Sequence, residues 1–171
     1  TFAWDLDGDG VFETPGETST FAGLDGPASH PVTLQVCDPD AACNTDATTV
    51  DVTNVAPTAQ AGADVTTYRN APVSLAGTWT DPAASLDDPY AWTWDLAGDG
   101  TADASGSAAY GETATAAAAF ATEGVYNLTF AVTDADGASG QDSVRITVLN
   151  HAPDCSAAAA SPALLWPPNN K

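Results

Sequence analysis

The sequence predicts an all-β protein built from antiparallel β-sandwiches, and three observations lead to that prediction. Apolar residues alternate with polar ones over short stretches, as at Trp92, Trp94 and Leu96. Stretches rich in Asp, Gly and Pro separate these segments and are typical of turns. Two parts of the chain also match each other, which indicates that one β-rich unit occurs twice.

The same alternation predicts the individual strands of the second half in chain order. These strands are expected at residues 73–75, 92–96, 113–120, 126–132 and 144–148. The segment at 113–120 is rich in Ala and gives the weakest signal. No segment offers the periodicity of an amphipathic helix, so we expect strands and turns throughout.

The internal repeat has two matching blocks. Residues 2–10, FAWDLDGDG, recur as residues 92–100, WTWDLAGDG, and residues 32–57 match residues 128–153 without a gap. The offset grows from 90 to 96 residues, so the intervening loop is six residues longer in the second copy. The first copy lacks a counterpart to about residues 56–90. Because the chain starts inside this pattern and without an initiator Met, we expect it to be a fragment.

The Asp-x-Asp-x-Asp-Gly spacing of residues 5–10 is typical of the opening of a helix-flanked calcium loop. Such a loop needs a bidentate carboxylate at its last position, where this chain has Gly16, and it needs flanking helices. In the repeat Asp7 becomes Ala97, whereas both glycines persist. The sequence therefore favours a tight turn with Gly at positive φ over a helical calcium loop.

The charge limits the classes of partner. The 171 residues carry a formal charge of −20, and the only Lys and Arg residues are Arg69, Arg145 and Lys171. The electrostatic field of this negative charge repels phosphate backbones and anionic membrane surfaces, so no nucleic-acid partner is expected. It suits cation binding, and it equally suits salty surroundings in which ions screen self-repulsion. No run of about 18 apolar residues is present, so no membrane span is expected in this fragment.

Short strands at this spacing, with a Trp inside one strand and a Tyr near the start of a late strand, are typical of an immunoglobulin-like sandwich. Four stretches narrow this further: NVAP, SLAGTWTDP, WTWDLAGDG and EGVYNLTFAVTDADG, at residues 54–57, 74–82, 92–100 and 123–137. The stretches after the linker are similar to the Ser-x-Asp-Pro, Trp-Asp-Phe-Gly-Asp-Gly and Gly-x-Tyr-x-Val-x-Leu-x-Val-x-Asp signatures. In them the chain resembles the polycystic kidney disease (PKD) domain family.

The resemblance implies tandem immunoglobulin-like (PKD-type) antiparallel β-sandwiches. It covers residues 56–149 fully and the first copy as a domain without its first two strands. Leu6 and Leu96 stand where the family has Phe, and His30 stands where the second copy has Tyr126. The expected organisation is an incomplete sandwich, a linker, a complete sandwich, and a linker with the first strand of a following domain, at residues 1–53, 54–57, 58–149 and 150–171.

The resemblance also implies a calcium site at the entry of the complete domain. In calcium-binding members the linker Asn, the Asp of the Asp-Pro turn and the Asp that ends the late strand hold the ion. Those positions are Asn54, Asp81 and Asp134 here, and Asp136 or Asp87 would assist. Oxygen ligands from several loops are what Ca²⁺ requires. The alternative is that these side chains only cap turns.

The first copy offers fewer acidic candidates. Asp38 is its counterpart of Asp134 and the only match to the calcium pattern there. A second candidate calcium site is the turn of Asp5, Asp7 and Asp9, because three carboxylates in one turn repel one another unless a cation or solvent screens them.

The first copy also has two cysteines that the second lacks. Cys37 and Cys43 replace Thr133 and Ser139 on either side of the expected late hairpin. Their spacing permits a cross-hairpin disulfide, which would indicate an oxidising, extracytoplasmic compartment. Two buried free thiols are the alternative. Cys155 is left over, and its partner would lie beyond the end of this sequence.

Catalysis is not expected, because His30 and His151 lie near no Gly-x-Ser-x-Gly, zinc or phosphate-loop motif. The sequence predicts an extracellular, secreted or cell-surface structural and adhesive module, a calcium-stiffened tandem repeat of a long surface protein or extracellular filament. Its expected partners are neighbouring domains of the same chain or identical subunits, which would complete each other by strand addition.

The alternative is an accessory module of a secreted hydrolase that binds chitin, collagen or another extracellular polymer. It would need a row of exposed aromatic side chains. Trp4 and Trp94 fall on the expected core position, and Trp92 shares the parity of Trp94, which leaves Trp79 and Trp166 as free aromatics. Two scattered residues are too few for a binding strip.

Overall fold

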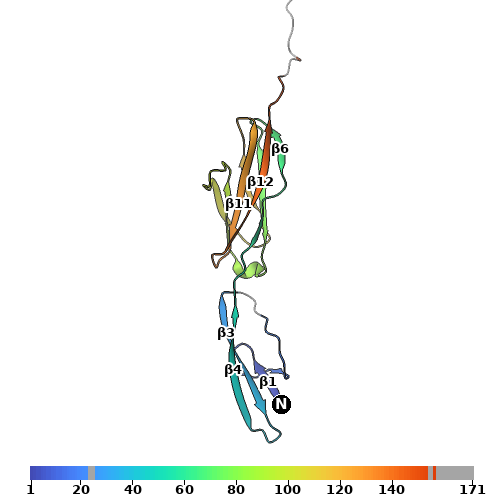
Figure 1. The fold of residues 1–171 in the computed structure, drawn as a ribbon, viewed down its shortest axis with the longest axis vertical. Coiled ribbons are helices and arrows are strands. Elements are labelled where there is room, and N and C mark those ends of the chain that lie inside the picture. Colours follow the sequence, from blue (N-terminus) through green and yellow to red (C-terminus); the bar gives the residue numbers. More distant parts are fainter. Residues whose placement is uncertain (23–25, 154–155, 157–171) are drawn as a thin grey trace, which may run out of the picture.

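The computed structural model describes residues 1–22, 26–153 and 156, and this part of the chain consists of strands with one short 3-10 helix. Two regions lie end to end along the long axis (Figure 1). We call residues 1–53 the first region and residues 58–149 the second region. Their sheets are antiparallel except for one parallel pair, so the predicted all-β fold is confirmed.

The first region is one sheet in the order β2-β1-β3-β4. Its strands are β1 (Phe2–Asp5), β2 (Thr14–Pro15), β3 (Ala28–Cys37) and β4 (Cys43–Val52). β3 and β4 form a long hairpin ladder, and β1 pairs with the other side of β3, with Trp4 opposite Leu34. No second sheet covers this one among the residues that the structure describes.

The second region is a sandwich of a three-stranded sheet, β10-β7-β5, and a five-stranded sheet, β6-β12-β11-β8-β9. Its elements are β5 (Thr58–Gln60), β6 (Val65–Tyr68), β7 (Val73–Thr80), η1 (Ala84–Asp87), β8 (Tyr90–Asp95), β9 (Ala104–Ala108), β10 (Ala114–Ala118), β11 (Gly124–Thr133) and β12 (Ser139–Leu149). The parallel pair is β6 with β12.

The core of the second region lies between its two sheets. Burial alternates at every residue of β7, because its large apolar side chains point to the opposite sheet and its small side chains, Ser74, Ala76, Thr78 and Thr80, point to solvent. Trp94 and Phe130 are fully buried, and their ring centroids lie 4.9 Å apart. A Cβ on Gly77 would lie 2.6 Å from the Phe130 ring, so this strand carries glycine where that ring packs against its backbone.

The expectation that Trp79 is a free aromatic is wrong. Its side chain is only 6% exposed and packs against Tyr90 in the core, with the ring centroids 5.3 Å apart. The reason is the strict alternation of β7, which puts Trp79 on the same face as Val73 and Leu75. Trp166 lies outside the described residues.

No helix in the described part of the chain has the length and apolar character needed to cross a membrane.

Candidate functional site

A cluster of three buried carboxylates lies at the end of the second region that faces the first region, beside η1 (Figure 1). Asp81 follows β7, Asp87 ends η1, and Asp134 follows β11. One carboxylate oxygen from each lies within 4.8 Å of the others. The three residues are 6%, 1% and 5% exposed, respectively. Buried carboxylates this close require compensation for their mutual repulsion.

Local turns explain how two of the three carboxylates are positioned. Asp81 accepts a hydrogen bond at Oδ1 from the Ala83 backbone N–H, 2.9 Å away, and so forms an Asx turn that leads into η1. Asp134 accepts one at Oδ1 from the Ala138 N–H, 2.8 Å away, which closes the turn between β11 and β12. The turn-capping role expected as an alternative is therefore present. It uses only one oxygen of each carboxylate.

The second oxygens of the Asp81 and Asp134 carboxylates differ in their hydrogen bonding. Asp134 Oδ2 accepts a hydrogen bond from the side-chain amide of Asn54, 2.9 Å away, which ties the linker to the domain. Asp81 Oδ2 is buried and has no hydrogen-bond partner. A buried carboxylate oxygen without a donor is costly, and a bound cation is one way to compensate it.

Tyr90 forms part of the same environment. Its hydroxyl donates a hydrogen bond to the backbone carbonyl of Ala84, 2.8 Å away, and the ring is fully buried. Burial raises the pKa of Tyr90 well above its ordinary value, and the charges of nearby acidic residues raise it further. These residues are Asp81, Asp87, Asp88 and Asp134. Tyr90 therefore stays neutral and supplies a hydrogen-bond donor beside a strongly negative cluster.

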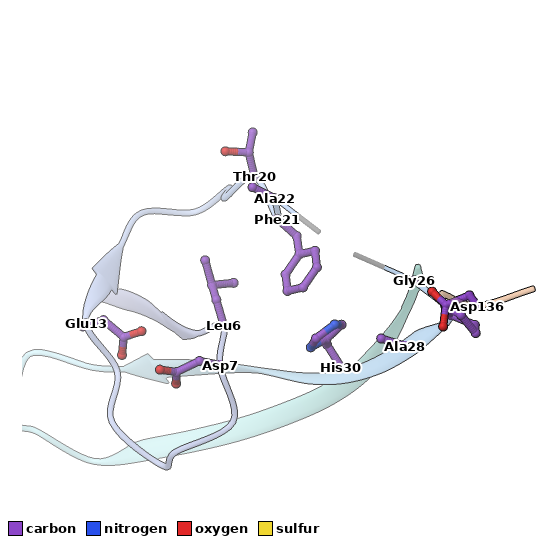
Figure 2. Close-up of a pocket in the computed structure, with 11 residues that line it drawn as sticks. Leu6, Asp7, Glu13, Thr20, Phe21, Ala22, Gly26, Ala28, His30 and Asp136 are labelled. Carbon is purple, nitrogen blue, oxygen red and sulfur yellow. The ribbon is translucent and has the colours of Figure 1, made fainter. Parts of the chain in front are cut away.

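The structure brings together four of the five residues expected at this entry site, and the fifth lies elsewhere. Asn54, Asp81, Asp87 and Asp134 belong to one neighbourhood. Asp136 is exposed and instead lines a pocket of the first region, beside Gly26 (Figure 2). Tyr90 was not predicted from the sequence, in which its only signal is its place at the start of an alternating strand.

The acidic turn at residues 5–10 of the first region is more exposed than the carboxylate cluster of the second region. Asp5 accepts hydrogen bonds from the backbone N–H groups of Gly8 and Gly10, at 2.7 and 2.9 Å, and both glycines have positive φ. Asp7 and Asp9 are exposed, although an oxygen of each lies within 4.8 Å of an oxygen of Asp5. The geometry is that of a turn between two strands. A cation at this turn stays a prediction.

The equivalent turn of the second region uses Asp95 in the same way. Its carboxylate accepts hydrogen bonds from the Gly100 N–H at 2.8 Å and from the Gly98 N–H at 2.6 Å. The backbone hydrogen bond from Gly100, joined by those from Gly98, Asp99 and Ala97, lowers the pKa of Asp95. Backbone donors of this kind stabilise the ionised carboxylate.

Asp38 lies in the turn between β3 and β4. One of its oxygens accepts hydrogen bonds from the N–H groups of Asp40 and Ala42, at 3.0 and 2.9 Å. Among the described residues, neither group of three clustered acidic side chains includes Asp38. A role in calcium binding stays a prediction here too.

The predicted cross-hairpin disulfide is confirmed. Cys37 and Cys43 face each other on β3 and β4 and are joined, with their Cα atoms 4.1 Å apart. At the same place in the second region the hydroxyls of Thr133 and Ser139 form a hydrogen bond of 2.7 Å. Cys155 lies outside the described residues.

The two-sheet arrangement of the second region, with the acidic cluster and the bound linker Asn at its entry, is that of an immunoglobulin-like module of the PKD type. The family model of the PKD domain matches residues 54–148, which is more than half of the chain, so the chain belongs to the PKD domain family. A search of curated proteins finds no match.

Membership of the family gives the chain a broad functional class. PKD domains are generally extracellular, non-catalytic modules that are linked to neighbouring domains. The family therefore indicates a structural, adhesive or accessory module of an extracellular protein.

Proposed function

We propose that this chain is a calcium-stiffened structural element, in which tandem PKD-type units extend or attach a long surface protein or an extracellular filament. The observation that carries the proposal is the buried cluster of Asp81, Asp87 and Asp134. At 4.8 Å, the upper limit of these distances, two ionised carboxylates repel by roughly 3.5 kcal/mol for an effective dielectric constant of about 20. A divalent cation would convert this repulsion into attraction.

The donor set fits Ca²⁺. All three side chains offer hard carboxylate oxygens, and Asn54 can add its amide oxygen if the side chain turns over. Asp81 Oδ2 is the oxygen that most needs a partner, because it is buried and accepts no hydrogen bond. The loops that carry these residues come from both sheets, as a site formed by several loops requires.

Two contacts explain how calcium at this site would stiffen the junction between the regions. Asn54 belongs to the linker and is hydrogen-bonded to Asp134 of the cluster. Farther along the linker, the carbonyl of Pro57 packs against Gly140 of β12 so closely that a Cβ at that glycine would overlap it. An ion held by the cluster would therefore restrain a linker that is already held at its other end, which limits hinge motion.

The experiment that tests the proposal is thermal unfolding of the full chain in EDTA and in millimolar calcium. With the affinity typical of extracellular modules and calcium at 10 to 100 times Kd, the second region should gain about 1.4–2.7 kcal/mol. Asp81→Asn should abolish the gain, whereas Glu123→Gln, which removes an exposed carboxylate of the same region, should retain it.

Two results would contradict the proposal. One is the absence of a calcium-dependent rise in the unfolding midpoint of the unmodified chain. The other is an equal rise in sodium chloride of matched ionic strength, because general screening of a chain with charge −20 would then explain the effect.

A further inference from the structure

Asn127 lies near the start of β11, on the outer face of the five-stranded sheet of the second region. The next residue, Leu128, is fully buried between the sheets, so Asn127 points to solvent and is exposed. Thr129 lies two residues farther along the strand and shares this outer face. Figure 1 shows β11 beside β12, where Asn127 pairs with Arg145. An amide and a hydroxyl therefore stand on the same solvent-facing surface.

The surroundings of Asn127 leave room for a bulky group on its side-chain amide. On one side β8 ends at Asp95, and the turn that follows brings Gly98 beside the backbone carbonyl of Asn127. Glycine has no side chain that could crowd the amide. On the other side Arg145 is engaged in an ion pair, with its Nε 3.2 Å from Oδ2 of Asp64.

Exposed apolar side chains lie next to Asn127 on the same face. Val125, two residues earlier on β11, is 60% exposed, and Leu149 and Tyr68 are 42% and 48% exposed. Val125 pairs with Thr147 of β12, and Leu149, two residues beyond Thr147, pairs with Tyr68 of β6. We call Val125, Leu149 and Tyr68 the apolar strip. Neighbouring apolar side chains at a surface mark a place that another group covers.

The sequence around Asn127 is an acceptor signal. Asn127, Leu128 and Thr129 form an Asn-x-Thr triplet without Pro in the middle, which is the signal for N-linked glycosylation. It is the only complete Asn-x-Ser or Asn-x-Thr triplet in the 171 residues. The counterparts of Asn127 and Thr129 in the first region are Pro31 and Thr33. The shared strand therefore does not require an Asn at this position.

The compartment of the protein is compatible with this modification, which takes place during export from the cytoplasm. The disulfide between Cys37 and Cys43 indicates oxidising, extracytoplasmic surroundings. PKD domains are also generally extracellular.

We propose that Asn127 carries an N-linked glycan that covers the apolar strip. In the transfer, Nδ2 of Asn127 forms a bond to the anomeric carbon of a sugar that is activated as a lipid-linked phosphate ester. The bond between that carbon and the phosphate oxygen breaks, the lipid phosphate leaves, and Nδ2 loses one proton to a base of the transferase. Because β11 is paired with β12 in the folded chain, the transfer precedes this pairing. The proposal goes beyond the calcium-stiffened rod and does not depend on calcium.

The test uses the full chain as its source organism exports it, with the disulfide intact. Cleavage after Glu123 and before Asp134 releases residues 124–133, GVYNLTFAVT, which contain no other acidic residue. Mass spectrometry should find an added glycan mass on this peptide in most copies of the protein. Fragmentation should place that mass on Asn127.

Three variants locate the acceptor. Asn127→Gln and Thr129→Ala should each abolish the added mass, because the first removes the amide and the second removes the hydroxyl of the acceptor signal. Thr129→Ser keeps a hydroxyl and should retain the glycan, which separates a lost signal from a lost fold. Thr93→Ala is the matched control, a half-buried Thr on the outer face of β8, and it should also retain the glycan.

The covering role has a readout of its own. Asn127→Gln should bind a hydrophobic dye more strongly than the glycosylated chain, because the apolar strip is then open to solvent. A second change, Val125→Thr, should remove this increase.

Three results would overturn the proposal. The first is a peptide of residues 124–133 without added mass in the exported protein. The second is an added mass on Thr129 instead of Asn127, which would make the modification O-linked. The third is equal dye binding by the glycosylated chain and the Asn127→Gln variant, which would contradict the covering of the apolar strip.

Discussion

The two regions of this chain form sheets with the same register and differ in what covers them. β1, β3 and β4 of the first region pair as β8, β11 and β12 do in the second, and the turns after Asp5 and Asp95 have the same backbone hydrogen bonds. Only the second region has a second sheet among the described residues. Strand pairing and turn geometry are therefore the same in both regions, whereas most of the deeply buried apolar side chains lie between the two sheets of the second region.

Individual positions reflect this difference. Val144 is buried beneath the second sheet, and its counterpart Thr48 is exposed. Gly140 allows the close approach of Pro57, and its counterpart is Asn44. Where the second region has a side-chain hydrogen bond at the end of the hairpin, the first has a disulfide.

The largest expected effect is on the core. Phe130→Ala should destabilise the second region by about 3–5 kcal/mol, because the ring is fully buried against Trp94. The matched change in the first region, Leu34→Ala, should cost about 1 kcal/mol, since that side chain is only partly buried. Urea unfolding followed by hydrogen exchange of each region measures both. Equal losses would show that Leu34 is buried as deeply as Phe130 in solution.

The next largest effect is expected where the linker residue Pro57 packs against Gly140 of β12. Gly140→Ala should destabilise the second region by about 3 kcal/mol, because the new Cβ would overlap the carbonyl of Pro57 and force the linker and β5 away from the sheet. Asn44→Ala at the matched position should change stability by less than about 0.5 kcal/mol. Calorimetry of both variants gives the comparison. A neutral Gly140→Ala variant would mean that the linker is not held at this point.

The disulfide should contribute about 2 kcal/mol to the first region, as expected for a loop this short. Reduction should therefore increase hydrogen exchange in β3 and β4 and leave β11 and β12 unchanged. The Cys37→Ser, Cys43→Ser double variant should show the same loss and no further response to reductant. If reduction opened both regions equally, the link would not act locally.

The smallest effect is on the turn of the second region, and it depends on pH. The pKa of Asp95 is lower in the folded chain than in the unfolded chain, so its stabilising contribution is present above the unfolded pKa and is lost as pH falls through the folded pKa. Asp95→Asn should lower the unfolding midpoint slightly at pH 7 and have no effect at strongly acidic pH. A constant deficit across the pH range would exclude the ionised form as the cause.

The alternation of apolar residues predicted most of the long strands, since β7, β8, β11 and β12 each bury one face. It did not predict β5, β6 or β9, which are short and have few apolar residues. Trp79 was misplaced because only Val73 and Leu75 were used to mark its strand, whereas β7 continues to Thr80. Once β7 is extended, the alternation alone puts that side chain in the core.

The candidate site was predictable only in part. Asn54, Asp81 and Asp134 could be named from their motifs, and Asp87 could be named only as a helper. Its burial depends on η1, whose short 3-10 turn has no periodic signal in the sequence. Asp136 lies two residues beyond Asp134, yet it is exposed and lines the pocket of the first region beside Gly26 instead of joining the cluster. Sequence spacing does not predict that difference in position.

Residue-resolved hydrogen exchange of the full chain, with and without calcium, measures the difference between the two regions and the position of the ion in one experiment. In EDTA, amides of β11 and β12 should exchange roughly 100-fold more slowly than those of β3 and β4, because only the former lie under a second sheet. Calcium should slow exchange further around Asn54, Asp81 and Asp134 and leave the first region unchanged. Equal protection in the two regions would contradict the difference in their covering sheets. A calcium effect shared by both regions would contradict a calcium site at the entry of the second region.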